Sequence, residues 1–298
     1  MGYALESSDT EAGPFLRRVA AEQLDKGLAD LEAARRGETR AGVHSVRKRM
    51  KKLRGLVRLV RGAFGDYGRI NATLRDTARV LSDVRDRAAV LEALDRLLDR
   101  QTAAGIDGRR IAPLVRGLEA ERDRAEEARD LGDRLAVVAS GLTALREEAP
   151  DWTLEAAGWD AFEGGLTQTY ARARKSMESA REDPQTDTLH DWRKRSKYHG
   201  YHARLLAPVW PRGMSGHAAE ASRLSDILGD RHDLDVLEPR VAAADIHGDT
   251  LLALREVIAA ERARLDGLAQ VAGGRLLADR PKALARRWGR WYALRDQA

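Results

Sequence analysis

Two segments of the chain repeat one pattern about half a chain length apart. Residues 43–60 read VHSVRKRMKKLRGLVRLV, and residues 189–206 read LHDWRKRSKYHGYHARLL. Both begin with an apolar residue and a histidine, and both have basic residues every three or four positions. The segments start 146 residues apart in a chain of 298 residues, which indicates one unit written twice. Both halves are therefore expected to fold in the same way.

The hydrophobic periodicity is helical almost everywhere. Apolar residues recur at three- and four-residue steps between prolines and glycines, strand-like alternation is missing, and aromatics make up only 5% of the chain. This predicts an all-α protein. We expect helices over residues 13–36, 41–62, 67–84, 86–103, 111–149, 158–182, 187–207, 214–229, 232–244, 250–272 and 280–296.

The repeat extends beyond the basic segments. LSDVRD at 81–86 matches LGDRHD at 228–233, and Phe15 and Phe162 hold the same place in the first helix of each half. The matched hexapeptides are predicted turns in which Asp86 and Asp233 cap the next helix. Pro150 falls at mid-chain. We therefore predict a flexible stretch over 1–12, then two pseudo-symmetric antiparallel helical bundles over 13–150 and 151–298 that form one domain.

The first basic segment forms an amphipathic helix of an unusual kind. One face is cationic, and the opposite face makes an apolar seam that we expect in the core. The cationic face comprises His44, Arg47, Lys48, Lys51, Lys52, Arg54 and Arg58, and the seam comprises Val46, Met50, Leu53, Val57 and Val60.

The second segment repeats this stripe in weaker form. Gly200 replaces one cation, and the remaining positions are His190, Arg193, Lys194, Lys197 and Arg204. His44 and His190 either donate to a bound anion or hydrogen-bond a neighbouring helix, and the sequence leaves both open. It also leaves open whether Arg75, Arg79 and Arg223 extend the basic surface or coat the exterior.

Nearly all excess positive charge lies in these two segments. Segment 43–60 has seven basic residues and no acid, and segment 189–206 has five basic residues and one acid. Their charges are +7 and +4, so subtracting 11 from the overall +5 leaves −6 on the other 262 residues. Because like charges on one helix face repel each other, an unrelieved cationic stripe predicts a polyanionic ligand.

Other features narrow the class of protein. The absence of cysteine excludes disulfides and thiolate chemistry. We find no signal-peptide pattern and no apolar run of membrane-spanning length, so we expect a cytoplasmic protein without membrane contact. The stripes lack the interleaved aromatics of single-strand binders and any helix-turn-helix, which disfavours specific nucleic-acid recognition, although non-specific binding stays an alternative.

An enzyme is the main rival interpretation. The dipeptides His190-Asp191 and His232-Asp233 are typical of metal-dependent phosphohydrolases of the HD type. Neither dipeptide is preserved in the other half, which argues against that function. His199 and His202 lie one turn apart and suit either a metal or, as we favour, the protein surface.

The two His-x-x-Arg helices, each followed by an L-[SG]-D-x-x-D motif, resemble the CHAD domain, the conserved histidine α-helical domain, over about 14–296. The resemblance implies two helical bundles around a basic central pore. It also implies non-catalytic binding of inorganic polyphosphate and association with polyphosphate granules. The implied pore residues are His44, Arg47, Lys48, Lys51, Lys52, Arg54, His190, Arg193, Lys194 and Lys197; no metal, cofactor or catalytic residue is expected. We find no E-x-E-x-K signature of the triphosphate-tunnel domain that some members carry, so we expect a stand-alone CHAD protein.

Overall fold

The fold is known from a computed structural model that describes residues 2–100, 106–126 and 130–295. Every regular element in these ranges is helical, which confirms the predicted all-α class. The α-helices are α1 (Ala12–Arg35), α2 (Thr39–Leu59), α3 (Tyr67–Arg79), α4 (Ser82–Arg100), α5 (Gly108–Glu126), α6 (Leu131–Glu148), α7 (Asp160–Glu182), α8 (Thr186–Leu206), α9 (Pro211–Ala243), α10 (Asp249–Leu276) and α11 (Pro281–Leu294). Two 3₁₀ turns at Ala149–Asp151 and Ala207–Val209 precede α7 and α9.

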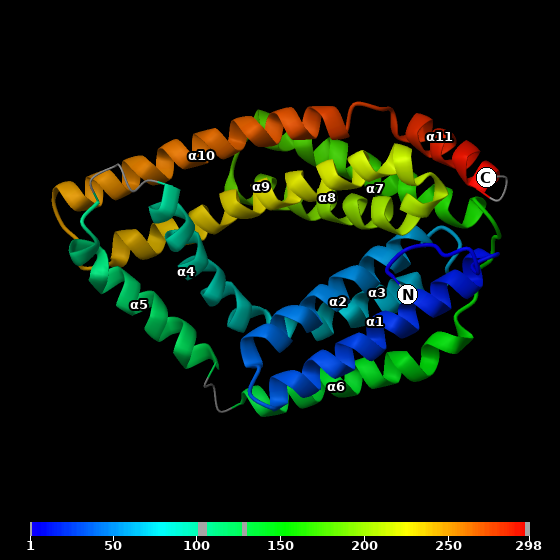
Figure 1. Cartoon of the computed structure of the whole chain (residues 1–298), viewed down its shortest axis with the longest axis horizontal. Helices are drawn as coiled ribbons and strands as arrows, with labels where there is room; N and C mark the ends of the chain where they lie inside the picture. Colours follow the sequence, from blue (N-terminus) through cyan, green and yellow to red (C-terminus); the bar gives the residue numbers. More distant parts are fainter. Residues whose placement is uncertain (1, 101–105, 127–129, 296–298) are drawn as a thin grey trace.

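The helices gather into two groups that touch in two places (Figure 1). In the first group α1 packs on α2 and α6, and α3 packs on α2. In the second group α7 packs on α8 and α11, and α9 packs between α8 and α10. The groups meet where α2 contacts α7 and α8, and again where α4, which also contacts α5, reaches α9. The tandem repeat and the division at Pro150 stay predictions.

The core contains the apolar seam predicted from the sequence. All five seam residues have zero exposed surface: Val46, Met50, Leu53 and Val57 of α2, and Val60 directly after its end. Phe15 and Phe162 are both fully buried and touch edge to face, with ring centroids 5.7 Å apart. Each such side chain contributes on the order of 2 kcal/mol through burial. This core fixes how α2 is rotated and therefore which way its basic residues point.

Two helix boundaries were predicted wrongly. The single helix expected over 111–149 is two helices, α5 and α6. The two helices expected over 214–229 and 232–244 are one continuous helix, α9. Residues 228–233 therefore form no turn, and Asp233 lies inside α9 rather than at its start. In the first half α3 does end before Leu81 and α4 begins at Ser82. Asp86 falls within α4 and is not its cap, and the side chains of residues 82–89 lie outside the described residues.

The N-terminal stretch before α1 lies across both groups. Tyr3 donates its hydroxyl to the carbonyl of Lys52 in α2 at 2.7 Å, and the amide of Leu5 donates to the carbonyl of Leu205 in α8 at 2.8 Å. Leu5 is buried. The segment thus ties α2 to α8. No helix in the described part of the chain is long and apolar enough to cross a membrane.

Candidate functional site: a basic cavity between the two helix groups

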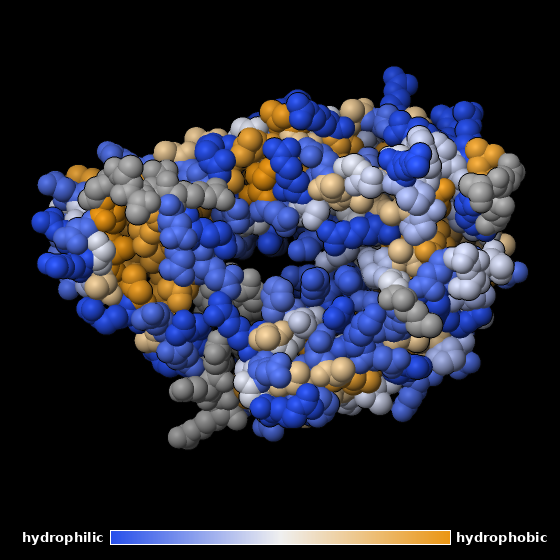
Figure 2. All heavy atoms as spheres, viewed as in Figure 1, coloured by the Kyte–Doolittle hydropathy of each residue, from blue (hydrophilic) through white to orange (hydrophobic). Residues whose placement is uncertain are grey.

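The cavity lies where α2 faces α8 and α9, between the two junctions of the helix groups. It measures about 650 Å³, within the usual range of ligand pockets of roughly 300–1,000 Å³. Figure 2 shows a hollow at this place, bordered mainly by hydrophilic residues. Seven of the twelve residues predicted from the sequence line it: His44, Arg47, Lys48, Lys51, Arg193, Lys197 and Arg204.

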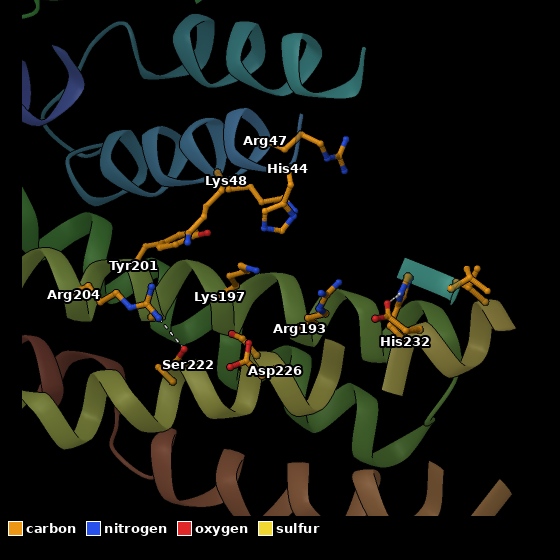
Figure 3. A pocket seen from close by; sticks show the side chains of 17 residues that line it. His44, Arg47, Lys48, Arg193, Lys197, Tyr201, Arg204, Ser222, Asp226 and His232 are labelled. Carbon is orange, nitrogen blue, oxygen red and sulfur yellow. Dashed lines mark hydrogen bonds and ion pairs between the residues drawn. The ribbon is translucent and has the colours of Figure 1, made fainter. Parts of the chain in front are cut away.

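Helix α2 presents its cationic face because its seam is fixed in the core. Figure 3 shows His44 and Lys48 extending from α2 toward α8. Arg47 also donates from Nη1 to the carbonyl of Ala78 at 3.2 Å, which anchors its side chain to the end of α3. The basic face therefore has a defined direction in space.

Helix α8 forms the opposite wall of the cavity. Its residues Trp192 and Ser196 have zero exposed surface, which turns Arg193 and Lys197 toward α2 (Figure 3). Gly200, which replaces a cation of the first stripe, allows α9 to approach, since a Cβ there would come within 3.3 Å of the Ala221 side chain. The missing cation is thus explained by close packing of α8 and α9.

Four lining cations have no carboxylate partner within ion-pair distance among the described residues: Lys48, Arg193, Lys197 and Arg204. The Nε of Arg193 is buried and has no hydrogen-bond partner within the ranges that the structure describes. Burial lowers the pKa of Lys197, and the nearby charges of Arg193, Arg204 and Lys48 lower it further, while Asp226 acts in the opposite sense. The cations of α2 and α8 therefore repel each other across the cavity.

Helix α9 supplies the polar lining that sequence reasoning missed. Its contribution includes Ser222, Ser225, Asp226, His232 and Asp233. Ser222 accepts a hydrogen bond from Arg204 at 2.8 Å (Figure 3). Asp233 is paired with Arg96 of α4 at 3.2 Å. The three- and four-residue spacing of these polar positions was a usable signal, but it was hidden because we divided α9 into two helices.

Three predicted residues of α2 lie outside the cavity lining, against aromatic or amide groups. Lys52 lies over the ring of Tyr3 at 4.9 Å, and burial together with neighbouring Arg49 and Lys48 lowers its pKa to about 8. Arg54 and Arg58 turn toward α3. They donate to Asn71 at 3.3 Å and to the hydroxyl of Tyr67 at 3.1 Å, respectively.

Two predicted residues of α8 also lie outside the lining. Lys194 pairs with Asp191 at 2.8 Å. His190 packs its ring on that of His232, with centroids 4.9 Å apart. Burial lowers the pKa of His190, and the charge of His232 lowers it further. His190 thus contacts α9, which fits the fold-holding alternative, while His44 lines the cavity.

The histidine–aspartate dipeptides are not arranged as a metal centre in the described part of the chain. No group of three or more His, Cys, Asp or Glu side chains there is placed to hold a metal ion. Asp191 is bound by Lys194 and by Arg195 at 3.2 Å. The Asp191 carboxylate is therefore already paired with two basic side chains of α8.

The surface placement favoured for His199 and His202 is wrong, since both have zero exposed surface. The Nε2 atom of His199 lies 2.7 Å from Nε2 of His217, and its ring stacks on Trp288 of α11. His202 instead bonds the carbonyl of Gly55. The two rings have different partners, so they do not form a metal pair either.

Arg75, Arg79 and Arg223 are exposed and lie outside the cavity lining. Arg75 pairs with Asp76 at 2.8 Å, and Arg223 pairs with Glu220 at 3.1 Å. The structure therefore places these arginines on the exterior.

Comparisons with known proteins agree on fold and family. The model of the CHAD domain matches residues 18–242, about three quarters of the chain. Among solved structures, PptA from Streptomyces chartreusis is similar, with a TM-score of 0.63 and 16% sequence identity over 90% of this chain and 99% of that one. At this identity the likeness concerns the fold alone. No curated protein sequence matches the chain.

Proposed function

The chain belongs to the CHAD domain family, and from that premise we propose that it binds inorganic polyphosphate non-covalently in the cavity between α2, α8 and α9. Family membership supports the class of ligand. The geometry of the cavity supports it as the binding site, because cations from α2 and α8, two helices far apart in the sequence, line the same cavity. In this proposal residues 13–150 and 151–298 are the two halves of one CHAD domain, and each provides one basic wall.

One observation carries the proposal. Lys48, Arg193 and Lys197 share one cavity of about 650 Å³ without a carboxylate partner among the described residues. Cations without a counter-charge repel each other, and a polyanion that contacts both walls of the cavity removes this repulsion. Arginine offers a planar fork to phosphate, and lysine offers a point charge that follows a flexible chain.

The lining favours a chain of phosphates over a nucleic acid. Tyr201 is the one tyrosine among its described residues, and tryptophan and phenylalanine do not occur there. Single-stranded nucleic-acid sites instead stack successive bases on several aromatic rings. A ligand that consists only of phosphate needs charge and length, which this cavity provides.

Binding of long-chain polyphosphate to a double variant tests the proposal. We expect Lys48→Gln with Lys197→Gln to weaken binding at physiological salt by at least about tenfold. Lys175→Gln with Arg181→Gln removes the same charge from exposed positions of α7 and serves as the control. Equal affinities of the two double variants would refute a role for the cavity. Adding duplex DNA as competitor tests ligand class, since DNA should displace polyphosphate poorly.

Association with polyphosphate granules follows from the same binding. A fluorescently tagged chain should co-localise with granules in polyphosphate-accumulating cells, and the cavity double variant should not. Equal granule association of the wild type and the double variant would show that localisation does not depend on the cavity.

A further inference from the structure

A second group of arginines lies where α2, α7 and α8 meet. It consists of Arg58, Arg61, Arg172 and Arg195, and together with Thr169 and Tyr198 these surround a gap of about 10 Å³. None of the six residues lines the cavity described above. The group, called the arginine cluster below, therefore needs its own explanation.

Close backbone packing brings the cluster together. A Cβ at Gly165 of α7 would overlap the carbonyl oxygens of Arg58 and Leu59 at the end of α2. This approach lets Arg61 donate from Nη2 to the carbonyl of Gly165 at 3.2 Å and to the hydroxyl of Thr169 at 3.1 Å. The arrangement is thus fixed by the main chain rather than by flexible surface side chains.

Among the described residues, the partners of the two inner arginines are all neutral. Arg58 is 8% exposed, bonds the hydroxyl of Tyr67 at 3.1 Å, and lies over the ring of Tyr198 at 4.3 Å. The Nε atoms of Arg58 and Arg61 are both buried without a hydrogen-bond partner in the described part of the chain. Buried guanidinium groups without a counter-charge are costly, because burial removes their hydration.

The cluster also has little negative charge to balance its arginines. Among the described residues, Asp191 is the one carboxylate that pairs with any of its four arginines, and it is shared between Arg195 at 3.2 Å and Lys194 at 2.8 Å. Burial lowers the pKa of Arg61 to about 10, and the charge of Arg172 contributes in the same direction. An anion at this place would relieve the repulsion among these arginines.

We propose that the arginine cluster is a second oxyanion site that takes a phosphate group, either free orthophosphate or the end of a polyphosphate chain. Guanidinium forks suit the oxygens of such a group. Since the gap is only large enough for about one water, the anion binds at its rim, on the side of the exposed Arg172. This site goes beyond the proposed function, because the cavity does not contain it.

Orthophosphate binding to the full chain, measured by calorimetry at low ionic strength, tests the site. The background variant is Lys48→Gln with Lys197→Gln, in which the cavity is weakened. In this background we expect Arg172→Gln to weaken phosphate binding by at least about fivefold. Lys175→Gln, three residues further along α7 and also exposed, should leave it unchanged. Because Arg172 is exposed, its replacement is expected to leave the fold intact, and circular dichroism verifies this.

Saturation of the wild-type chain with long-chain polyphosphate distinguishes the two sources. If the Arg172-dependent binding of orthophosphate disappears, the chain end occupies the cluster; if it persists, the cluster takes free phosphate. Equal phosphate binding by the Arg172 and Lys175 variants, or no phosphate binding by the background variant, overturns the proposal. Failure of the proposed function gives a different result, namely equal polyphosphate binding by the wild type and the background variant.

Discussion

His202 donates its Nε2–H to the carbonyl oxygen of Gly55 across 3.0 Å, which joins α8 to α2 where the two helices cross. The ring has zero exposed surface, and burial lowers its pKa to about 3. The donor is therefore a neutral imidazole whose tautomer is set by the carbonyl, since a carbonyl only accepts. This contact helps to hold the two walls of the cavity at a fixed separation.

Gly55→Ala should separate these walls. A Cβ at this position would come within 2.8 Å of the Tyr201 Cβ and of the Tyr3 hydroxyl, so α2 and α8 must shift. We expect a loss of about 1–3 kcal/mol in the free energy of unfolding, measured by denaturant titration, together with weaker polyphosphate binding. Gly216 is at an exposed position of α9, and a Cβ added there meets nothing within 4 Å. Gly216→Ala should therefore be neutral or stabilising by up to about 1 kcal/mol. Equal stability of the two variants would contradict the crossing described here.

Acid should destabilise the fold through its buried histidines. Burial lowers the pKa of His202 to about 3 and that of His217 to about 4, and it lowers the pKa of His199 well below 6.5. Between pH 6.5 and about 4 the unfolded chain binds more protons than the folded chain, so stability falls as the pH falls. Each such histidine contributes about 1.4 kcal/mol per pH unit in that window.

Thermal denaturation from pH 7.5 to 4.5 measures this slope. His202→Gln should reduce the pH dependence by about one proton. An identical slope for the wild type and His202→Gln would show that His202 is not buried in neutral form.

Asp226→Asn should strengthen polyphosphate binding. Asp226 lines the cavity and raises the pKa of Lys197 through its charge, so its carboxylate also repels a bound phosphate. We expect about a two- to tenfold gain in affinity at low salt. Asp187→Asn removes the same charge at the exposed start of α8 and should have a much smaller effect. Weaker binding by Asp226→Asn would instead indicate that the carboxylate positions Lys197 for the ligand.

Polyphosphate binding should depend on salt in proportion to the number of cations engaged. By analogy with DNA, each cation lost reduces the slope of log affinity against log salt by about one. The slope of Lys48→Gln with Lys197→Gln should therefore be lower by about two than that of the wild type. An unchanged slope would mean that the two lysines do not contact phosphate.

Polyphosphate incubated with the chain and Mg²⁺ or Mn²⁺ should keep its length. The function proposed here is binding, whereas the HD-type rival predicts hydrolysis through His190, Asp191, His232 and Asp233. Gel electrophoresis of the polyphosphate after incubation separates the two. Shortening that His232→Ala abolishes would favour the enzyme.

Local periodicity predicted correctly which face of α2 enters the core. The α2 seam from Val46 to Val60 is buried as expected, because one face of an amphipathic helix must enter the core. The same reasoning missed the continuity of α9. Gly229 there lies inside the helix, where a Cβ would approach Nη2 of Arg193 to 3.0 Å, so this glycine makes room for a cation rather than ending a helix. Whether a glycine ends a helix or makes room for another side chain depends on a neighbour that is remote in the sequence.

The sequence by itself determined the helical class and the basic face of each repeated helix, because both follow from spacing along one helix. Only the tertiary structure decided which cations share a cavity. Lys48 and Lys197 line it together, whereas Arg58, on the same predicted stripe, is buried against Tyr67 and Tyr198. The physical reason is that a stripe of 15 residues spans several turns of a helix, and different turns of α2 meet different neighbours. Burial of His199 and His202 has the same origin, since Trp288 and Gly55 come from elsewhere in the chain.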